Sequence, residues 1–200
     1  MKLRRMHLAP AALAAMMGVL LFCGGCENSG NEFQRLVCEV SQINEGMPLI
    51  SGYLNAGQDR LVGTIDDFFP IDYAEVIFHA RPYSSLITMV EDGPHSYFHV
   101  TSYDLIWHPM SPGSEPMVNY GIMGAGVDVL VPVNEDAAVS IMIADRYMKE
   151  QPFFSDLYFG VQIPFTARCE LRFHGHETGS EDEVVVPASF MVSCVGIVID

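Results

Sequence analysis

Residues 160–174 (GVQIPFTARCELRFH) and 184–199 (VVVPASFMVSCVGIVI) are the two longest extended stretches of this 200-residue chain. Apolar and polar side chains alternate through much of both, which is typical of strands that cover a core with one face. Residues 177–183, with Gly179 and Ser180 near the centre, have the composition of a turn. The pair therefore predicts two long neighbouring strands at the end of a β-rich domain.

Shorter extended stretches precede this pair at regular spacing, with turn-forming residues between them. They cover residues 36–43, 47–54, 73–81, 96–108, 127–133 and 139–144. Seven to nine short strands with almost no helix predict an all-β fold, an antiparallel β-sandwich.

The stretch at residues 96–108 changes the phase of its apolar residues midway. This change predicts a β-bulge near Thr101 or Ser102, because one extra residue reverses the faces of those that follow. Trp107, the only tryptophan of the chain, is expected in the core.

Two short stretches depart from the strand pattern. Residues 145–154 are the best helical candidate, about two turns long and ended by Pro152, which cannot donate a backbone hydrogen bond. Gly121, Gly124 and Gly126 lack the spacing of a phosphate-binding loop, so we expect a turn between strands there.

The first 26 residues have the three-part composition of a secretory signal peptide. Basic residues open it, an apolar run over residues 8–22 follows, and small residues over 23–26 close it. The apolar run is shorter than the roughly 20 residues that a membrane-spanning helix needs. We therefore expect a peptide that is cleaved; an uncleaved anchor helix is the alternative.

The end of this leader, Gly24-Gly25-Cys26, resembles the lipobox of bacterial lipoproteins, with Cys23 where that family usually has Leu. The resemblance implies cleavage before Cys26 and lipidation of Cys26, which anchors the protein to a membrane. Because Glu27 follows, rather than the Asp that holds well-studied lipoproteins at the inner membrane, the resemblance favours the outer membrane.

The predicted domain organisation follows from this leader. Residues 1–25 are the signal peptide, residues 26–32 are the lipidated N-terminus and a flexible tether, and residues 33–200 are the β-sandwich domain. A mature chain of about 175 residues is long enough to bury a core as one domain.

The charge of the chain limits its partners. Cleavage removes Lys2, Arg4 and Arg5, which leaves seven basic residues against 25 acidic ones and a net charge near −18. Nucleic acid is excluded as a partner, because its binding depends on clustered basic residues. Cations and basic proteins remain possible partners.

Three cysteines remain after Cys26, namely Cys38, Cys169 and Cys194. The strand pattern turns all three toward the core, where a free cysteine acts as a small hydrophobe. An exported protein can also form disulfides, so the sequence leaves two alternatives: three buried thiols, or one bridge that involves Cys194.

Three short motifs are similar to a group of small bacterial lipoproteins that have immunoglobulin-like sandwiches. They are residues 78–83 (FHARPY), 101–103 (TSY) and 173–177 (FHGHE), and the resemblance spans residues 35–199. It implies an immunoglobulin-like form of the sandwich and a location in the cell envelope, and it carries over no activity. We expect no cofactor.

His174 and His176 lie two residues apart on an extended segment, so both rings leave the same face, together with Glu170. Such a pair can supply two ligands of a zinc or copper site. The third would have to come from another strand, with candidates His79, His99 and His108. Solvated histidines beside a turn are the simpler alternative.

A second metal candidate combines His108 with three methionines of a Pro- and Gly-rich stretch, since thioether sulfur suits cuprous ion. The methionines are Met110, Met117 and Met123. The acidic turns at residues 134–136 and 181–183 lack the alternating ligands of a calcium loop, which favours solvated charge.

Motifs of nucleophilic or metal-dependent hydrolysis do not occur in the mature chain. Asp66-Asp67 and the pair of Asp72 with Glu75 offer neighbouring carboxylates, as a glycosidase needs, but a chain with 25 acidic residues contains such pairs by chance. We therefore predict a non-catalytic structural or interaction module of the cell envelope, with a possible protein partner. Metal binding is the first alternative and hydrolysis the second.

Overall fold

The computed structural model describes residues 34–58, 60–63, 67–85 and 96–198. They belong to one compact unit that begins at Gln34. The predicted signal peptide and Cys26 lie outside the described residues. The described part is mostly β-structure, arranged in two sheets that pack together.

The elements follow one another as short strands with little helix between them. They are β1 (Leu36–Ile43), η1 (Asn44–Gly46), β2 (Leu49–Asn55), β3 (Asp72–Pro82), β4 (Tyr97–Pro109), η2 (Glu115–Tyr120), β5 (Ile122–Pro132), β6 (Asp136–Ala144), α2 (Arg146–Lys149), α3 (Pro152–Tyr158), β7 (Phe165–Glu177) and β8 (Val184–Val198). Each stretch predicted to be extended overlaps one of these strands.

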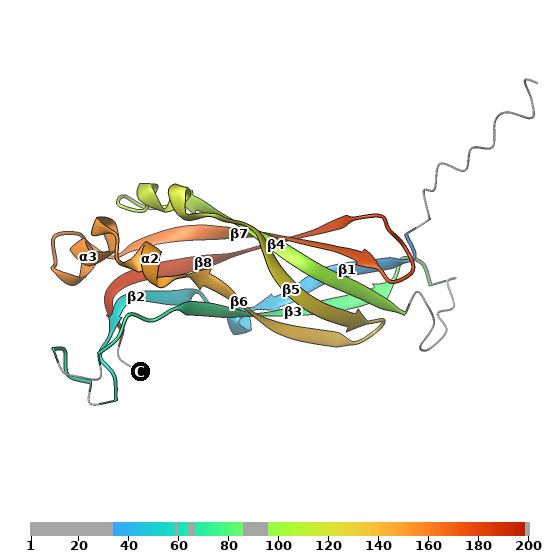
Figure 1. The fold of residues 1–200 in the computed structure, drawn as a ribbon, viewed down its shortest axis with the longest axis horizontal. Helices are drawn as coiled ribbons and strands as arrows, with labels where there is room; N and C mark the ends of the chain where they lie inside the picture. The colour runs from blue at the N-terminus through green and yellow to red at the C-terminus, as the bar shows by residue number, and fades with distance from the viewer. Residues whose placement is uncertain (1–33, 59, 64–66, 86–95, 199–200) are drawn as a thin grey trace, which may run out of the picture. The chain divides into compact units, whose positions relative to one another are not determined.

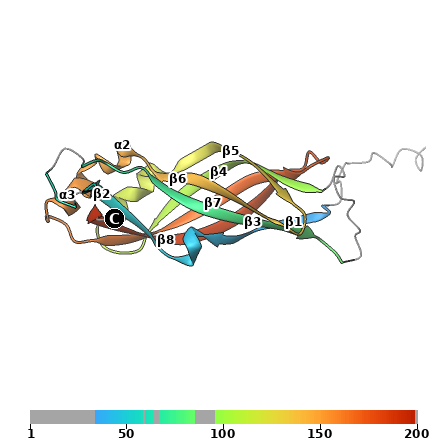
Figure 2. The same cartoon turned by 90° about the horizontal axis from the view of Figure 1, so that it is seen from below.

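The strands form a smaller sheet of order β1-β3-β6 and a larger sheet of order β2-β8-β7-β4-β5. Figures 1 and 2 show the two layers from directions 90° apart. Apolar side chains of both sheets meet between the layers. For example, the rings of Phe78 and Phe173 pack edge to face, with their centroids 4.8 Å apart. The all-β, two-layer prediction is confirmed.

The predicted pair of long C-terminal strands is also confirmed. β7 and β8 are antiparallel neighbours, in register from Phe165 opposite Cys194 to Gly175 opposite Val184. The short connection between them makes this pairing a hairpin.

The prediction of a wholly antiparallel sandwich is wrong for one ladder. β2 runs parallel to β8, with Leu49 opposite Val192 and Asn55 opposite Val198. A hairpin forces antiparallel pairing only between strands that a tight turn connects. β2 and β8 are separated by most of the domain, so no turn fixes their relative direction.

The β-bulge predicted in β4 is confirmed. The β4–β7 ladder shifts register between Val100 and Ser102 and leaves Thr101 as the extra residue. The β4–β5 ladder shifts at the same place, but there the extra residue lies on β5. The side chain of Trp107 is 2% exposed, as predicted, and its Nε1 donates a hydrogen bond to the Tyr120 carbonyl.

Two local predictions are wrong. Pro152 begins α3 instead of ending a helix, because the first turn of a helix needs no backbone N–H donor. Gly124 and Gly126 lie within β5 rather than in a turn. At Gly124 the backbone has φ +64°, beside a register shift of the β4–β5 ladder, so the glycines allow an irregular edge strand.

Candidate functional site

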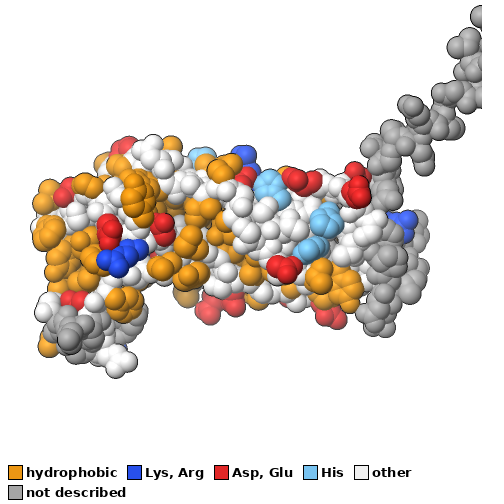
Figure 3. Space-filling model, viewed as in Figure 1, with side chains coloured by type: hydrophobic (Ala, Val, Ile, Leu, Met, Phe, Trp, Pro, Cys, Tyr) orange, Lys and Arg blue, Asp and Glu red, His pale blue; other side chains and the backbone are white. Residues whose placement is uncertain are grey.

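The predicted histidine pair lies on the outer face of the larger sheet. His174 and His176 of β7 alternate with buried residues and leave the sheet on the same side as Glu170, as predicted. The next strand brings His99 to His176, with ring centroids 5.3 Å apart. Figure 3 shows histidine side chains beside acidic ones on this face.

Both ring nitrogens of His174 form hydrogen bonds with carboxylates. Its Nδ1 lies 2.8 Å from Glu183 Oε1 and its Nε2 lies 3.0 Å from Asp104 Oδ2. Hydrogen bonds to Glu183 and then Asp104 raise the pKa of His174. The Gly124 N–H and His174 lower the pKa of Asp104. His174 therefore connects β7 to β4 and to the connection between β7 and β8.

Three other histidines of the described residues, His79, His99 and His108, also pair with carboxylates. His108 Nε2 lies 2.8 Å from Glu170 Oε2, and hydrogen bonds from Arg172 and His108 lower the pKa of Glu170. His79, on the smaller sheet, pairs with Asp136. Within the described ranges, no group of three or more His, Cys, Asp or Glu is arranged to hold a metal ion.

The proposed copper set is divided between core and surface. Met117 is fully buried, whereas Met110 and Met123 are exposed. The carboxylates of Asp72 and Glu75 are also divided, since Asp72 is buried and Glu75 is exposed on the other face of β3.

A buried polar cluster, which the sequence patterns did not predict, joins three elements beneath α2. Lys149 is fully buried, and its Nζ lies 2.7 Å from Asp72 Oδ1 and 2.7 Å from the carbonyl oxygen of Gly52. The hydroxyl of Ser51 donates to Asp72 Oδ2. Asp72 lies on the same face of β3 as buried Ala74 and Val76. An acidic residue in this core phase was the one sequence signal for a buried polar cluster.

The cysteines of the described domain are three buried thiols, Cys38, Cys169 and Cys194. This is the first of the two predicted alternatives. Burial raises the pKa of Cys38 and Cys194 to about 12 and raises that of Cys169 further. Such thiols are poor nucleophiles, because the thiolate is the reactive form.

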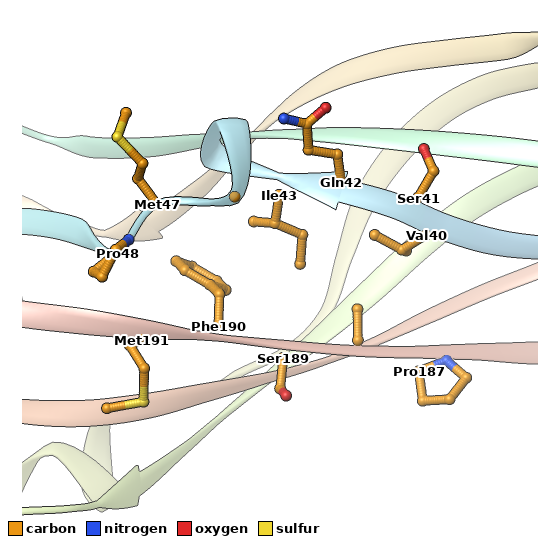
Figure 4. Close-up of a pocket in the computed structure, with 12 residues that line it drawn as sticks. Val40, Ser41, Gln42, Ile43, Met47, Pro48, Pro187, Ser189, Phe190 and Met191 are labelled. Carbon is orange, nitrogen blue, oxygen red and sulfur yellow. The ribbon is translucent and has the colours of Figure 1, made fainter.

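A groove of about 420 Å³ opens between β1 and β8. Figure 4 shows Ile43 and Phe190 pointing toward each other from the two sides. Its other described lining residues are also apolar or neutral, so it offers no acid or base. β1 has a register shift after Val40 on this side, and β8 has Pro187. Both features disfavour the addition of a further strand in the groove.

A group of exposed apolar side chains follows α3, and we call Phe159, Val161 and Ile163 the apolar tip. Their exposed fractions are 70%, 75% and 72%. The loop folds back onto α3, since the N–H groups of Val161 and Gln162 both donate to the Asp156 carbonyl. Figure 3 shows apolar side chains gathered over the end of the domain that carries α2 and α3.

The apolar tip and the first described residues lie at opposite ends of the sandwich (Figure 1). The N–H groups of Arg35 and Leu36 donate to Glu177, where β7 ends and the hairpin to β8 begins. α3 instead packs near the C-terminal half of β8, where Leu157 meets Gly196.

Comparisons with known proteins gave no match to a family model, a curated protein or a solved structure. A search of the described helices for one long and apolar enough to cross a membrane found none.

Proposed function

We propose that this chain is an exported lipoprotein, acylated at Cys26 and held at the outer membrane, whose immunoglobulin-like sandwich is a non-catalytic interaction module. The three-part leader and the Gly24-Gly25-Cys26 sequence support export and acylation. The apolar tip is the observation that carries the interaction role, because exposed apolar patches on soluble domains mark interaction sites.

The sheet orders support the immunoglobulin-like part of the proposal. In that fold the first, second and fifth strands share one sheet, and the last two strands share the other with the third. β1, β3 and β6 correspond to the first set, and β8, β7 and β4 to the second, with β5 as the extra strand of the variable type. β2 then continues the first strand after it has crossed to the other sheet.

The position of the apolar tip indicates a partner other than the anchoring bilayer. A fully extended tether over residues 27–33 spans at most about 25 Å. β8 alone has 15 residues, which extend over roughly 50 Å. An upright domain therefore presents the tip well away from the lipid at Cys26.

The charge near the tip indicates the chemistry of that partner. Asp156 lies in α3, Glu150 beside α2 is already paired with Arg146, and the mature chain has a net charge near −18. Electrostatic complementarity therefore favours a protein that presents an apolar patch with Lys or Arg around it. A second copy of this acidic chain would be repelled.

Site-specific photocrosslinking in intact cells tests this proposal. A photoreactive amino acid at Val161 of the full-length lipoprotein should give one defined protein adduct, and the same probe at exposed Glu75 should not. Adding Ile163→Asp should remove the Val161 adduct while the protein stays folded. Equal adducts at Val161 and Glu75, an adduct with lipid, or a dimer of this chain would overturn the proposal.

A further inference from the structure

The buried cluster beneath α2 holds an amine and a carboxyl group in contact, and both groups are shielded from solvent. Lys149 Nζ lies 2.7 Å from Asp72 Oδ1, and the two side chains are 0% and 7% exposed. Lysine and aspartate are rarely buried to this degree. Separating the two groups would leave an uncompensated buried charge. The free-energy cost of that charge keeps the two groups together.

Neighbouring elements fix both groups in position. Asp72 begins β3, and Lys149 ends α2, whose first turn is capped by the Asp145 side chain. The Gly52 carbonyl accepts a hydrogen bond from Lys149, and Ser51 donates one to the second oxygen of Asp72. Groups held in this way react with high effective concentration, because the entropy of bringing them together is already lost on folding.

The environment also favours the forms that condense. Burial raises the pKa of Asp72 and lowers the pKa of Lys149, with the partner charge opposing each shift. Both shifts favour transfer of the lysine proton to the carboxylate within the pair. A neutral amine is the nucleophilic form of lysine, and a protonated carboxyl can lose water.

We propose that Lys149 and Asp72 form an intramolecular isopeptide bond. The lone pair of Nζ attacks Cγ of the protonated carboxyl, and the Ser51 hydroxyl stabilises the negative charge that develops on Oδ2. Oδ1 leaves as water with its own proton and one from Nζ. The product is a secondary amide and one water molecule, so the step needs neither an oxidant nor a cofactor.

The bond would connect α2 to the start of β3 across 77 residues of sequence. It would hold the segment leading to α3 and the apolar tip against the sandwich. The Gly52 carbonyl would keep its hydrogen bond, because a secondary amide retains one N–H. The inference is independent of the proposed interaction role.

Peptide mapping of the full-length protein tests the bond directly. Cleavage after glutamate gives residues 46–75, which contain Asp72, and residues 136–150, which contain Lys149. The wild-type digest should contain these two peptides joined, with a mass lower than their sum by one water. Fragmentation should place the link at Asp72 and Lys149.

Two variants serve as controls. Lys149→Arg keeps the positive charge but lacks the primary amine, and it should release the peptides separately. Ser51→Ala should slow formation of the linked peptide after refolding. Separate, unmodified peptides from folded wild-type protein would overturn the proposal, and this result does not depend on whether either variant folds.

Discussion

His174 shows how a single outward-facing residue can join three segments of the domain. It lies on β7, and its ring nitrogens contact Asp104 of β4 and Glu183 of the hairpin to β8. Both carboxylates raise its pKa, so the folded state binds the proton more tightly than the unfolded chain does. Protonated His174 therefore stabilises the fold below the unfolded pKa, and this contribution disappears as pH rises through the folded pKa.

We predict that His174→Gln destabilises the domain more at about pH 5.5 than at about pH 9, by up to about 1 kcal/mol, since exposed ion pairs contribute on that order. Urea unfolding of both proteins at the two pH values measures the difference. An equal loss of stability at both values would contradict the role of the protonated ring.

Lys149 is the residue whose environment the sequence indicated least. Lysine is the residue type least expected in a core, and its neighbour Tyr147 is exposed in the same short helix. Asp72 carried a weak signal through its strand phase. Only the packing of α2 over β2 and β3 shows that the two charges meet.

At the scale of elements, the contact between α3 and β8 positions the apolar tip. Gly196 of β8 lies directly under the backbone of α3. A Cβ added there would lie 2.7 Å from the Leu157 carbonyl oxygen and 3.0 Å from Tyr158 Cα. These are backbone atoms, so relief requires a shift of the helix.

We predict that Gly196→Ala destabilises the domain by about 1–3 kcal/mol, the usual effect of overpacking. It should also reduce crosslinking from Val161, because α3 carries the tip. Gly126→Ala is the matched control, since no atom lies within 4 Å of the added Cβ. It should change the free energy of unfolding by no more than about 0.5 kcal/mol. Equal effects of the two substitutions would contradict this packing argument.

The elements also show which local patterns predict well. The bulge in β4 followed from the apolar phase alone, because each face of a strand must match its environment. Pro152 was assigned to the wrong end of a helix, because proline both interrupts one helix and starts the next favourably. The same residue type had two permitted positions, and tertiary packing selected one.

At the scale of the whole molecule, the acidic domain and the leader make one prediction about location. Cys26→Ala should leave an unprocessed precursor or release the protein from the membrane, because the variant lacks the thiol that we propose is acylated. Detergent phase separation and intact mass of wild type and variant measure this change. Cys38→Ala is the control, since Cys38 is a buried thiol of the domain. Unchanged mass and partitioning of Cys26→Ala would overturn the lipoprotein proposal.

By itself, the sequence determined the all-β class, the approximate place of each described strand, the phase of β4 and the outward face shared by His174, His176 and Glu170. These features depend on the alternation of apolar and polar residues and on turn residues between strands. Both are local patterns that can be read directly from the sequence. The tertiary structure alone decided the parallel pairing of β2 with β8, the burial of Lys149 against Asp72 and the place of the apolar tip at the α3 end of the domain, opposite the start of β1. Each depends on segments far apart in the chain, whose contacts are set by packing of the two sheets and not by any local pattern.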